Sequence, residues 1–166
     1  TAMKKIFAML AAILFCGAMM VSCDKKDNND NDNPKFPTKA DMAGTWEGNF
    51  QGTTTIEEQN KAYTISWVLT LNPEGSNTVG NIKYTAKING MEDISYEVVV
   101  NNYYALQNVM RGRICLTGNR PAGIAEDMID FDIDLNAKTM TASLTANFSA
   151  GEDLVTIGGE TTLKKK

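Results

Sequence analysis

Residues 63–71, YTISWVLTL, decide the fold of this chain, because apolar and polar side chains alternate along them. Successive side chains of a β-strand point to opposite faces of a sheet, so this stretch predicts a strand with one buried face. The buried face consists of Tyr63, Ile65, Trp67, Leu69 and Leu71. The stretch ends at Asn72-Pro73-Glu74-Gly75, which has the composition of a turn.

The same alternation recurs along nearly all of residues 36–166, and no segment there shows a sustained helical period. Asn89-Gly90 is a strong hairpin signal between two alternating stretches. The pattern predicts eight strands, at 45–53, 63–71, 79–88, 91–101, 109–117, 128–135, 139–148 and 154–163. Eight antiparallel strands joined mostly by short turns favour a single all-β domain folded as an up-and-down barrel, with a β-sandwich as the second choice.

The N-terminal residues have the pattern of an export signal. Lys4 and Lys5 precede an apolar run at 6–21, which is short for a membrane-spanning helix, and Ser22 stands directly before Cys23. The pattern resembles bacterial lipoproteins, although Met20 stands where that family usually has leucine. The resemblance implies a signal peptide at 1–22 and diacylation of Cys23. An ordinary secretory signal or a retained hydrophobic anchor are the alternatives.

Residues 24–35 contain no apolar side chain, so residues 23–35 are interpreted as the lipidated cysteine and a disordered tether. The acidic and amide-rich run after Cys23 is similar to the start of surface-exported lipoproteins of the Bacteroides group. This resemblance implies an outer-membrane lipoprotein at the cell surface, with the periplasmic leaflet as the alternative.

A second resemblance concerns the start of the domain, where Gly44-Thr45-Trp46 is similar to the Gly-x-Trp motif of lipocalins and related calycin barrels. In that family the tryptophan packs across the closed end of the barrel, and an arginine near the last strand usually covers it. Here the last strand offers only Lys164 to Lys166. The resemblance implies a lipocalin-like shape.

Composition excludes several kinds of chemistry. The sequence has no histidine, which excludes serine–histidine and cysteine–histidine catalysis and imidazole-based zinc sites. Only carboxylate chemistry or oxygen-ligated calcium stays open. Removal of residues 1–22 leaves Cys115 as the one cysteine besides Cys23 and takes the net charge from -4 to -6, which disfavours binding of nucleic acid. We expect no enzyme activity and no cofactor.

Two sets of residues are candidates for a binding site. An eight-stranded barrel either fills with side chains or holds one small ligand. Its bulky inward positions are candidates for ligand contact or for plain core, namely Trp67, Tyr84, Tyr96, Phe131 and Phe148. The segment 101–108 is expected to be an exposed loop, in which Tyr103 and Tyr104 form the lip of a binding surface or cap the barrel end.

The last feature is an acidic stripe, which consists of Asp130, Asp132 and Asp134 on one face of the strand at 128–135. Solvated exterior is the ordinary interpretation. The sharper, more specific interpretation pairs the stripe with Arg111 and Arg113 on the preceding strand. A third interpretation, a glycosidase-like pair of carboxylates, fits an exposed stripe poorly.

Together these features predict a lipid-anchored envelope or surface protein that carries a small apolar or glycan-derived ligand. The alternative is a non-enzymatic module with a filled core, such as an accessory subunit or inhibitor, that binds a protein partner.

Overall fold

The computed structural model describes residues 35–117, 127–150 and 152–166. The predicted signal peptide and Cys23 lie outside the described residues, as does the tether except for Lys35. The chain divides at Asn33, and Pro34–Lys166 forms one compact unit with its own core. A compact unit with its own hydrophobic core can in principle fold by itself. No helix among the described residues has the length and apolar character needed to cross a membrane.

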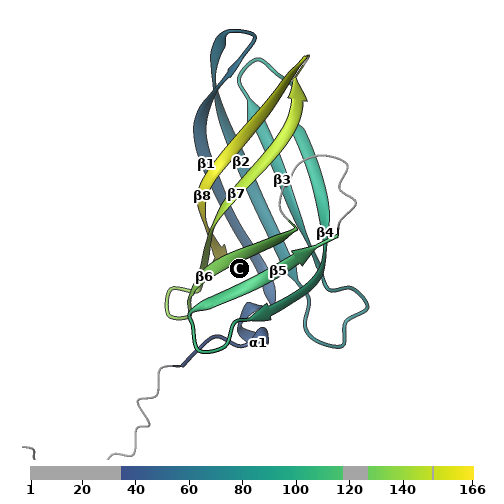
Figure 1. Ribbon diagram of the computed structural model, residues 1–166, viewed down its shortest axis with the longest axis vertical. Helices are drawn as coiled ribbons and strands as arrows, with labels where there is room; N and C mark the ends of the chain where they lie inside the picture. Colours follow the sequence, from purple (N-terminus) through teal and green to yellow (C-terminus); the bar gives the residue numbers. More distant parts are fainter. Residues whose placement is uncertain (1–34, 118–126, 151) are drawn as a thin grey trace, which may run out of the picture. The chain divides into compact units, whose positions relative to one another are not determined.

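Eight antiparallel strands form one sheet, in which each strand pairs with the next and β8 returns to β1 (Figure 1). One short helix, α1 (Lys39–Met42), precedes the sheet. The strands are β1 (Gly44–Ile56), β2 (Gln59–Leu71), β3 (Gly80–Ile88), β4 (Ile94–Ala105), β5 (Arg111–Leu116), β6 (Met128–Asp134), β7 (Thr139–Ala150) and β8 (Asp153–Lys165). The predicted all-β fold with eight sequential strands is confirmed at this level.

The core lies inside this closed ring and is built from the alternating positions. Burial alternates along β3 and β6 at every residue, with Ile82, Tyr84 and Ile133 facing inward. Because side chains alternate between the two faces of a strand, one run of apolar residues per strand fills the interior. Met110, which falls within the strand predicted at 109–117, is not part of this face, since it lies outside β5 and is 40% exposed.

Two loop predictions are wrong. The segment 101–108 is not an exposed loop, because β4 continues to Ala105 after a register shift between Val100 and Asn102. The added residue of such a bulge lets the strand continue with its apolar side chains on the interior face. The hairpin predicted at Asn89-Gly90 is present between β3 and β4, but its connection is longer than the predicted two residues, since β3 ends at Ile88 and β4 begins at Ile94.

The ring closes through a short ladder between β1 and β8, which pairs Trp46 with Lys165 and Glu47 with Lys164. Beyond this ladder, side chains and close backbone contacts join the two strands. The Phe50 ring covers Gly159, where a Cβ atom would lie 2.8 Å from the ring. The backbone N–H of Gly158 donates to the hydroxyl of Tyr63 at 3.1 Å. Glycine at these two positions of β8 therefore lets aromatic rings from β1 and β2 close the seam.

Candidate functional site

The five predicted interior aromatics all lie on the inner face of the ring, but they differ in burial. Trp67, Tyr84 and Phe131 have no exposed surface, Phe148 is 3% exposed, and Tyr96 is half-buried. Three of them form a chain of ring contacts, with centroids 5.1 Å apart between Trp67 and Tyr84 and 5.5 Å apart between Tyr84 and Tyr96. These separations are typical of packed aromatic pairs.

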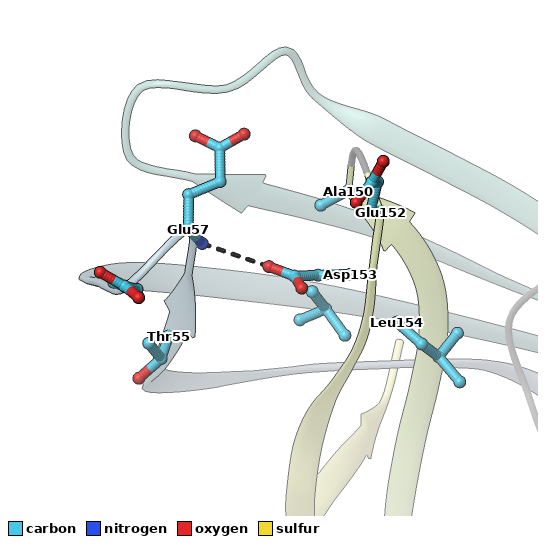
Figure 2. A pocket seen from close by; sticks show the side chains of 8 residues that line it. Thr55, Glu57, Ala150, Glu152, Asp153 and Leu154 are labelled. Carbon is cyan, nitrogen blue, oxygen red and sulfur yellow. Dashed lines mark hydrogen bonds between the residues drawn. The ribbon is translucent and has the colours of Figure 1, made fainter.

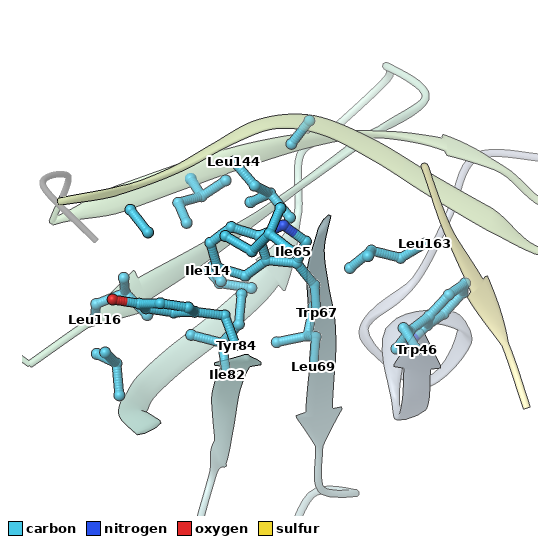
Figure 3. Close-up of a cluster of buried hydrophobic side chains, with 14 of the residues drawn as sticks. Trp46, Ile65, Trp67, Leu69, Ile82, Tyr84, Ile114, Leu116, Leu144 and Leu163 are labelled. Carbon is cyan, nitrogen blue, oxygen red and sulfur yellow. The ribbon is translucent and has the colours of Figure 1, made fainter. Parts of the chain in front are cut away.

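The middle of the ring is filled by side chains. A side chain that lines a water-sized cavity keeps accessible surface, because a solvent probe fits beside it. Ile65, Ile82 and Ile114, which lie in the same cluster as Trp67 and Tyr84 in Figure 3, also have an exposed fraction of 0%. The same fraction holds for the inward residues Ala86 and Ala146. The small residues Ala86 and Ala146 therefore leave no water-sized gap on the inner face.

Two polar atoms in this filled interior have no hydrogen-bond partner among the described residues. They are Nε1 of Trp67 and the hydroxyl oxygen of Tyr84. Burial raises the pKa of the Tyr84 hydroxyl well above its ordinary value, and the neighbouring Tyr96 raises it further. The indole nitrogen and the phenol oxygen point toward different parts of the cluster in Figure 3, so they do not converge on one place.

One end of the ring is closed by α1 and Trp46. The indole N–H of Trp46 donates to the carbonyl of Met42 at 2.8 Å, and both side chains are buried. The ammonium of Lys165 lies 5.1 Å from the Trp46 ring centroid and donates to the carbonyl of Asp41 at 2.9 Å. Sequence reasoning noted the lysines of the last strand but did not assign one of them to this position.

Tyr103 belongs to the same end of the ring and is 1% exposed, contrary to the expectation of an exposed lip. Its hydroxyl donates to the carbonyl of Asn72 at 2.6 Å, and the ammonium of Lys39 lies 5.0 Å from its ring centroid. Burial raises the pKa of Tyr103. The neighbouring Tyr104 is half-buried and lies opposite Arg113 in the ladder between β4 and β5. The structure therefore separates the two tyrosines, and Tyr103 caps the end of the ring.

A surface hollow of about 740 Å³ lies between the tips of the β1–β2 and β7–β8 hairpins. There the backbone N–H of Glu57 donates to Oδ2 of Asp153 at 3.2 Å, and Leu154 is 76% exposed (Figure 2). Three more acidic side chains line the hollow besides Asp153, namely Glu57, Glu58 and Glu152. Nevertheless, the described residues contain no group of three acidic or cysteine side chains arranged to hold a metal ion.

Two of the three carboxylates of the acidic stripe form ion pairs with β5, as the sharper interpretation predicted, whereas Asp134 accepts from the backbone N–H groups of Asn136 and Ala137. Nε of Arg111 lies 2.6 Å from Asp132, and Arg113 binds both carboxylate oxygens of Asp130 at 2.5 and 2.8 Å. The Arg113 guanidinium lowers the pKa of Asp130. Because these carboxylates are paired with arginine on the outer face, they are suited to fixing strand register and not to acid–base catalysis.

A second hollow, about 400 Å³, lies on the outer face beside these ion pairs, where β6 and β7 diverge. It is lined by Arg113, Met128, Ile129, Asp130 and Ser143, and Met128 is 52% exposed. Cys115 pairs with Met128 across the ladder and is half-buried, and it forms no disulfide.

Comparison of the chain with protein-family models, curated proteins and solved structures gives no match.

Proposed function

We propose that this chain is a lipid-anchored, non-enzymatic interaction module with a lipocalin-like barrel and a filled core, which binds a protein partner at the cell envelope. The observation that carries this proposal is the exposed fraction of 0% at Trp67, Tyr84 and Phe131. An interior filled by its own side chains offers no volume to a carried ligand, whereas ligand pockets usually have several hundred Å³. A binding partner would then contact the outer surface or the ends of the ring of strands.

The lipocalin-like assignment within this proposal is supported by the strand order and by the closed end of the ring. β1 to β8 pair in sequence order, as an up-and-down barrel requires. Lys165 lies against Trp46, the position where the resemblance implies an arginine, and it supplies the same positive charge. The anchor is proposed from Cys23 and the preceding apolar run, and the absence of histidine supports a non-enzymatic role.

Carriage of a small apolar or glycan-derived ligand is the second candidate. It is favoured by the two unpartnered donors, Nε1 of Trp67 and the hydroxyl of Tyr84, because a ligand with acceptor oxygens would satisfy them. The two functions differ in one directly measurable property, the occupancy of the interior.

Native mass spectrometry of the protein purified from its own membrane in mild detergent measures that occupancy. The interaction module predicts the mass of the processed polypeptide with lipid on Cys23 and nothing more. The same sample under denaturing conditions is the control. An additional small molecule that is present at one copy per chain and lost on denaturation would contradict the filled-core proposal and support carriage.

Photo-crosslinking in the living cell tests the interaction itself. A photoreactive phenylalanine analogue replaces, one at a time, the most exposed apolar residues of the described surface, Val99, Met128 and Leu154. We expect a covalent adduct with another protein from at least one of these positions, and none from the matched position Lys83 on the outer face of β3. Absence of a protein adduct at all three positions contradicts the proposal.

A further inference from the structure

Residues 142–150 of β7 have one edge without a strand partner among the described residues. The ladder between β6 and β7 contains three pairs, from Asp132–Thr141 to Asp134–Thr139. β7 continues to Ala150 and remains paired with β8 to its end. No described strand pairs with the other side of residues 142–150, and Figure 1 shows β7 rising away from β6. The hollow of about 400 Å³ lies next to this edge at Ser143.

The register shows which backbone groups this edge presents. The N–H of Ile133 donates to Met110 on the β5 side, so Asp132 directs its N–H and C=O toward β7, where it meets Thr141. These directions alternate along an antiparallel strand. The N–H and C=O groups of Ser143, Thr145 and Asn147 therefore point away from β8. The bond from the Lys165 N–H to the Lys138 carbonyl, on the β8 side, agrees with this alternation.

The seam between β8 and β1 is different, although its ladder is also short. There the N–H of Gly158 has Tyr63 as its acceptor, Phe50 lies over Gly159, and a Cβ atom at Gly48 would collide with the Thr162 carbonyl. Aromatic side chains and the backbone of β1 thus cover β8 at Gly158, Gly159 and Thr162. No described side chain forms a hydrogen bond with the backbone of β7 at Ser143, Thr145 or Asn147.

β7 is also the only one of the eight described strands without a charged side chain. Monomeric proteins commonly protect open strand edges with lysine, proline or other charges, because an unprotected edge pairs with another chain. The outward side chains of β7 are small and neutral: Thr139, Thr141, Ser143, Thr145, Asn147 and Ser149. The strand with the open edge is therefore the strand that lacks this protection.

We propose that residues 142–150 of β7 pair antiparallel with the same residues of a second copy of this chain, across a two-fold axis. The charge distribution selects this partner. The chain has a net charge of -4, so two copies repel each other overall, and a two-fold axis places identical residues opposite each other. On β7 this arrangement brings threonine, serine and asparagine together and satisfies the free N–H and C=O groups of both chains. It requires neither the lipid anchor nor a particular ligand.

The test is the mass of purified residues 34–166, measured by sedimentation equilibrium over about 1–300 μM, because a single strand pair gives an interface at the small and reversible end of the range. We expect the mass to rise toward twice that of the monomer. In the double variant Thr145→Lys with Asn147→Lys, the two-fold axis brings four lysines together, and we expect a monomer at every concentration.

The matched control is Thr139→Lys with Thr141→Lys, which adds the same charge to the same face of β7 where β6 covers the edge. This variant is expected to dimerise as the unmodified chain does. Circular dichroism checks that both variants fold. A monomeric unmodified chain at all concentrations overturns the proposal. If the variant with lysines at 145 and 147 still dimerises, the interface lies elsewhere and the proposal is overturned. The same conclusion follows if both variants abolish the dimer equally.

Discussion

The ammonium group of Lys165 lies 5.1 Å from the centroid of the Trp46 ring and donates a hydrogen bond to the carbonyl of Asp41. One side chain of β8 thereby joins the first residues of β1 to α1. The two residues also pair directly in the β1–β8 ladder. The closed end of the ring is thus held by a cation over an aromatic face, together with a charged hydrogen bond to the helix backbone.

Replacing Lys165 by alanine is expected to lower the free energy of unfolding by about 1–2 kcal/mol, since both the cation–π contact and the hydrogen bond are lost. Lys165→Arg keeps the charge and the donors and should recover most of the loss. Lys164→Ala removes an exposed lysine of the same strand and should have little effect. Urea denaturation of the three variants measures the differences. Equal losses for Lys164 and Lys165 would show that the ring contact contributes nothing.

Glycine at position 158 is expected to be required for closure of the seam. Gly158 has φ +120, and a Cβ atom there would lie 2.1 Å from the carbonyl oxygen of Leu144. Gly158→Ala should therefore cost at least about 2 kcal/mol, from backbone strain and displacement of β7. Gly75→Ala is the matched control, because Gly75 has φ +86 with open space around it, and its cost should stay near about 1 kcal/mol. Thermal unfolding of both variants measures the two losses of stability, and equal losses would contradict the prediction.

Much of the strand pattern could be predicted because alternation reports directly on burial. On β2, Ile65, Trp67 and Leu69 were expected to share one face, and all three have an exposed fraction of 0%. The pairing of Arg113 with Asp130 was also visible, since opposite charges on neighbouring strands favour one register. Both signals are local to one or two strands, which makes them readable without a structure.

The features that were missed depend on contacts distant in sequence. Tyr103 sits in a polar stretch typical of a loop, yet a bulge near Asn101 and the acceptor carbonyl of Asn72 keep it inside the ring. The divergence of β6 from β7 leaves no mark on the alternation of either strand. The filled interior depends on how side chains of different strands, such as Trp67 and Tyr84, fit against each other, and composition alone does not determine that fit.

Acid is expected to weaken the attachment of α1. The hydroxyl and N–H of Thr38 both donate to the Asp41 carboxylate, at 2.7 and 2.9 Å, and these bonds, led by the one from the side chain, lower the pKa of Asp41 below its ordinary value of 3.8. A lowered pKa means that the contribution to stability is present above pH 3.8 and is lost as the pH falls through the folded-state pKa.

Asp41→Asn should therefore lower the free energy of unfolding at pH 7 by about 0.5–1 kcal/mol, and the difference from the unmodified chain should shrink in acid below pH 3.8. Chemical denaturation at several pH values measures this difference. Asp93→Asn is the control, because Asp93 is exposed and its ion pair with Lys87 spans 3.6 Å. A pH-independent difference for Asp41→Asn would mean that the charge of the carboxylate has no part in the cap.

The two buried tyrosine hydroxyls give the sharpest stability test of the filled interior. The hydroxyl of Tyr84 has no partner in the described structure, whereas that of Tyr103 donates to Asn72 at 2.6 Å. A buried hydroxyl without a partner lowers stability, so Tyr84→Phe should leave the free energy of unfolding unchanged or raise it by up to about 1 kcal/mol. Tyr103→Phe makes the same chemical change and should lower it by about 1 kcal/mol, because a made hydrogen bond is lost and the Asn72 carbonyl is left unpaired.

Guanidinium denaturation of both variants, in protein stripped of small molecules by refolding and in protein purified natively, completes the comparison. If the interior is filled, Tyr84→Phe gives the same result in both preparations. If Tyr84→Phe is destabilising only in the native preparation, the Tyr84 hydroxyl of the unmodified chain has an acceptor that copurifies with the protein. Carriage of a ligand is then the better proposal for the function. Since Tyr103 bonds within the chain, its variant should lose the same stability in both preparations and so serves as the internal standard.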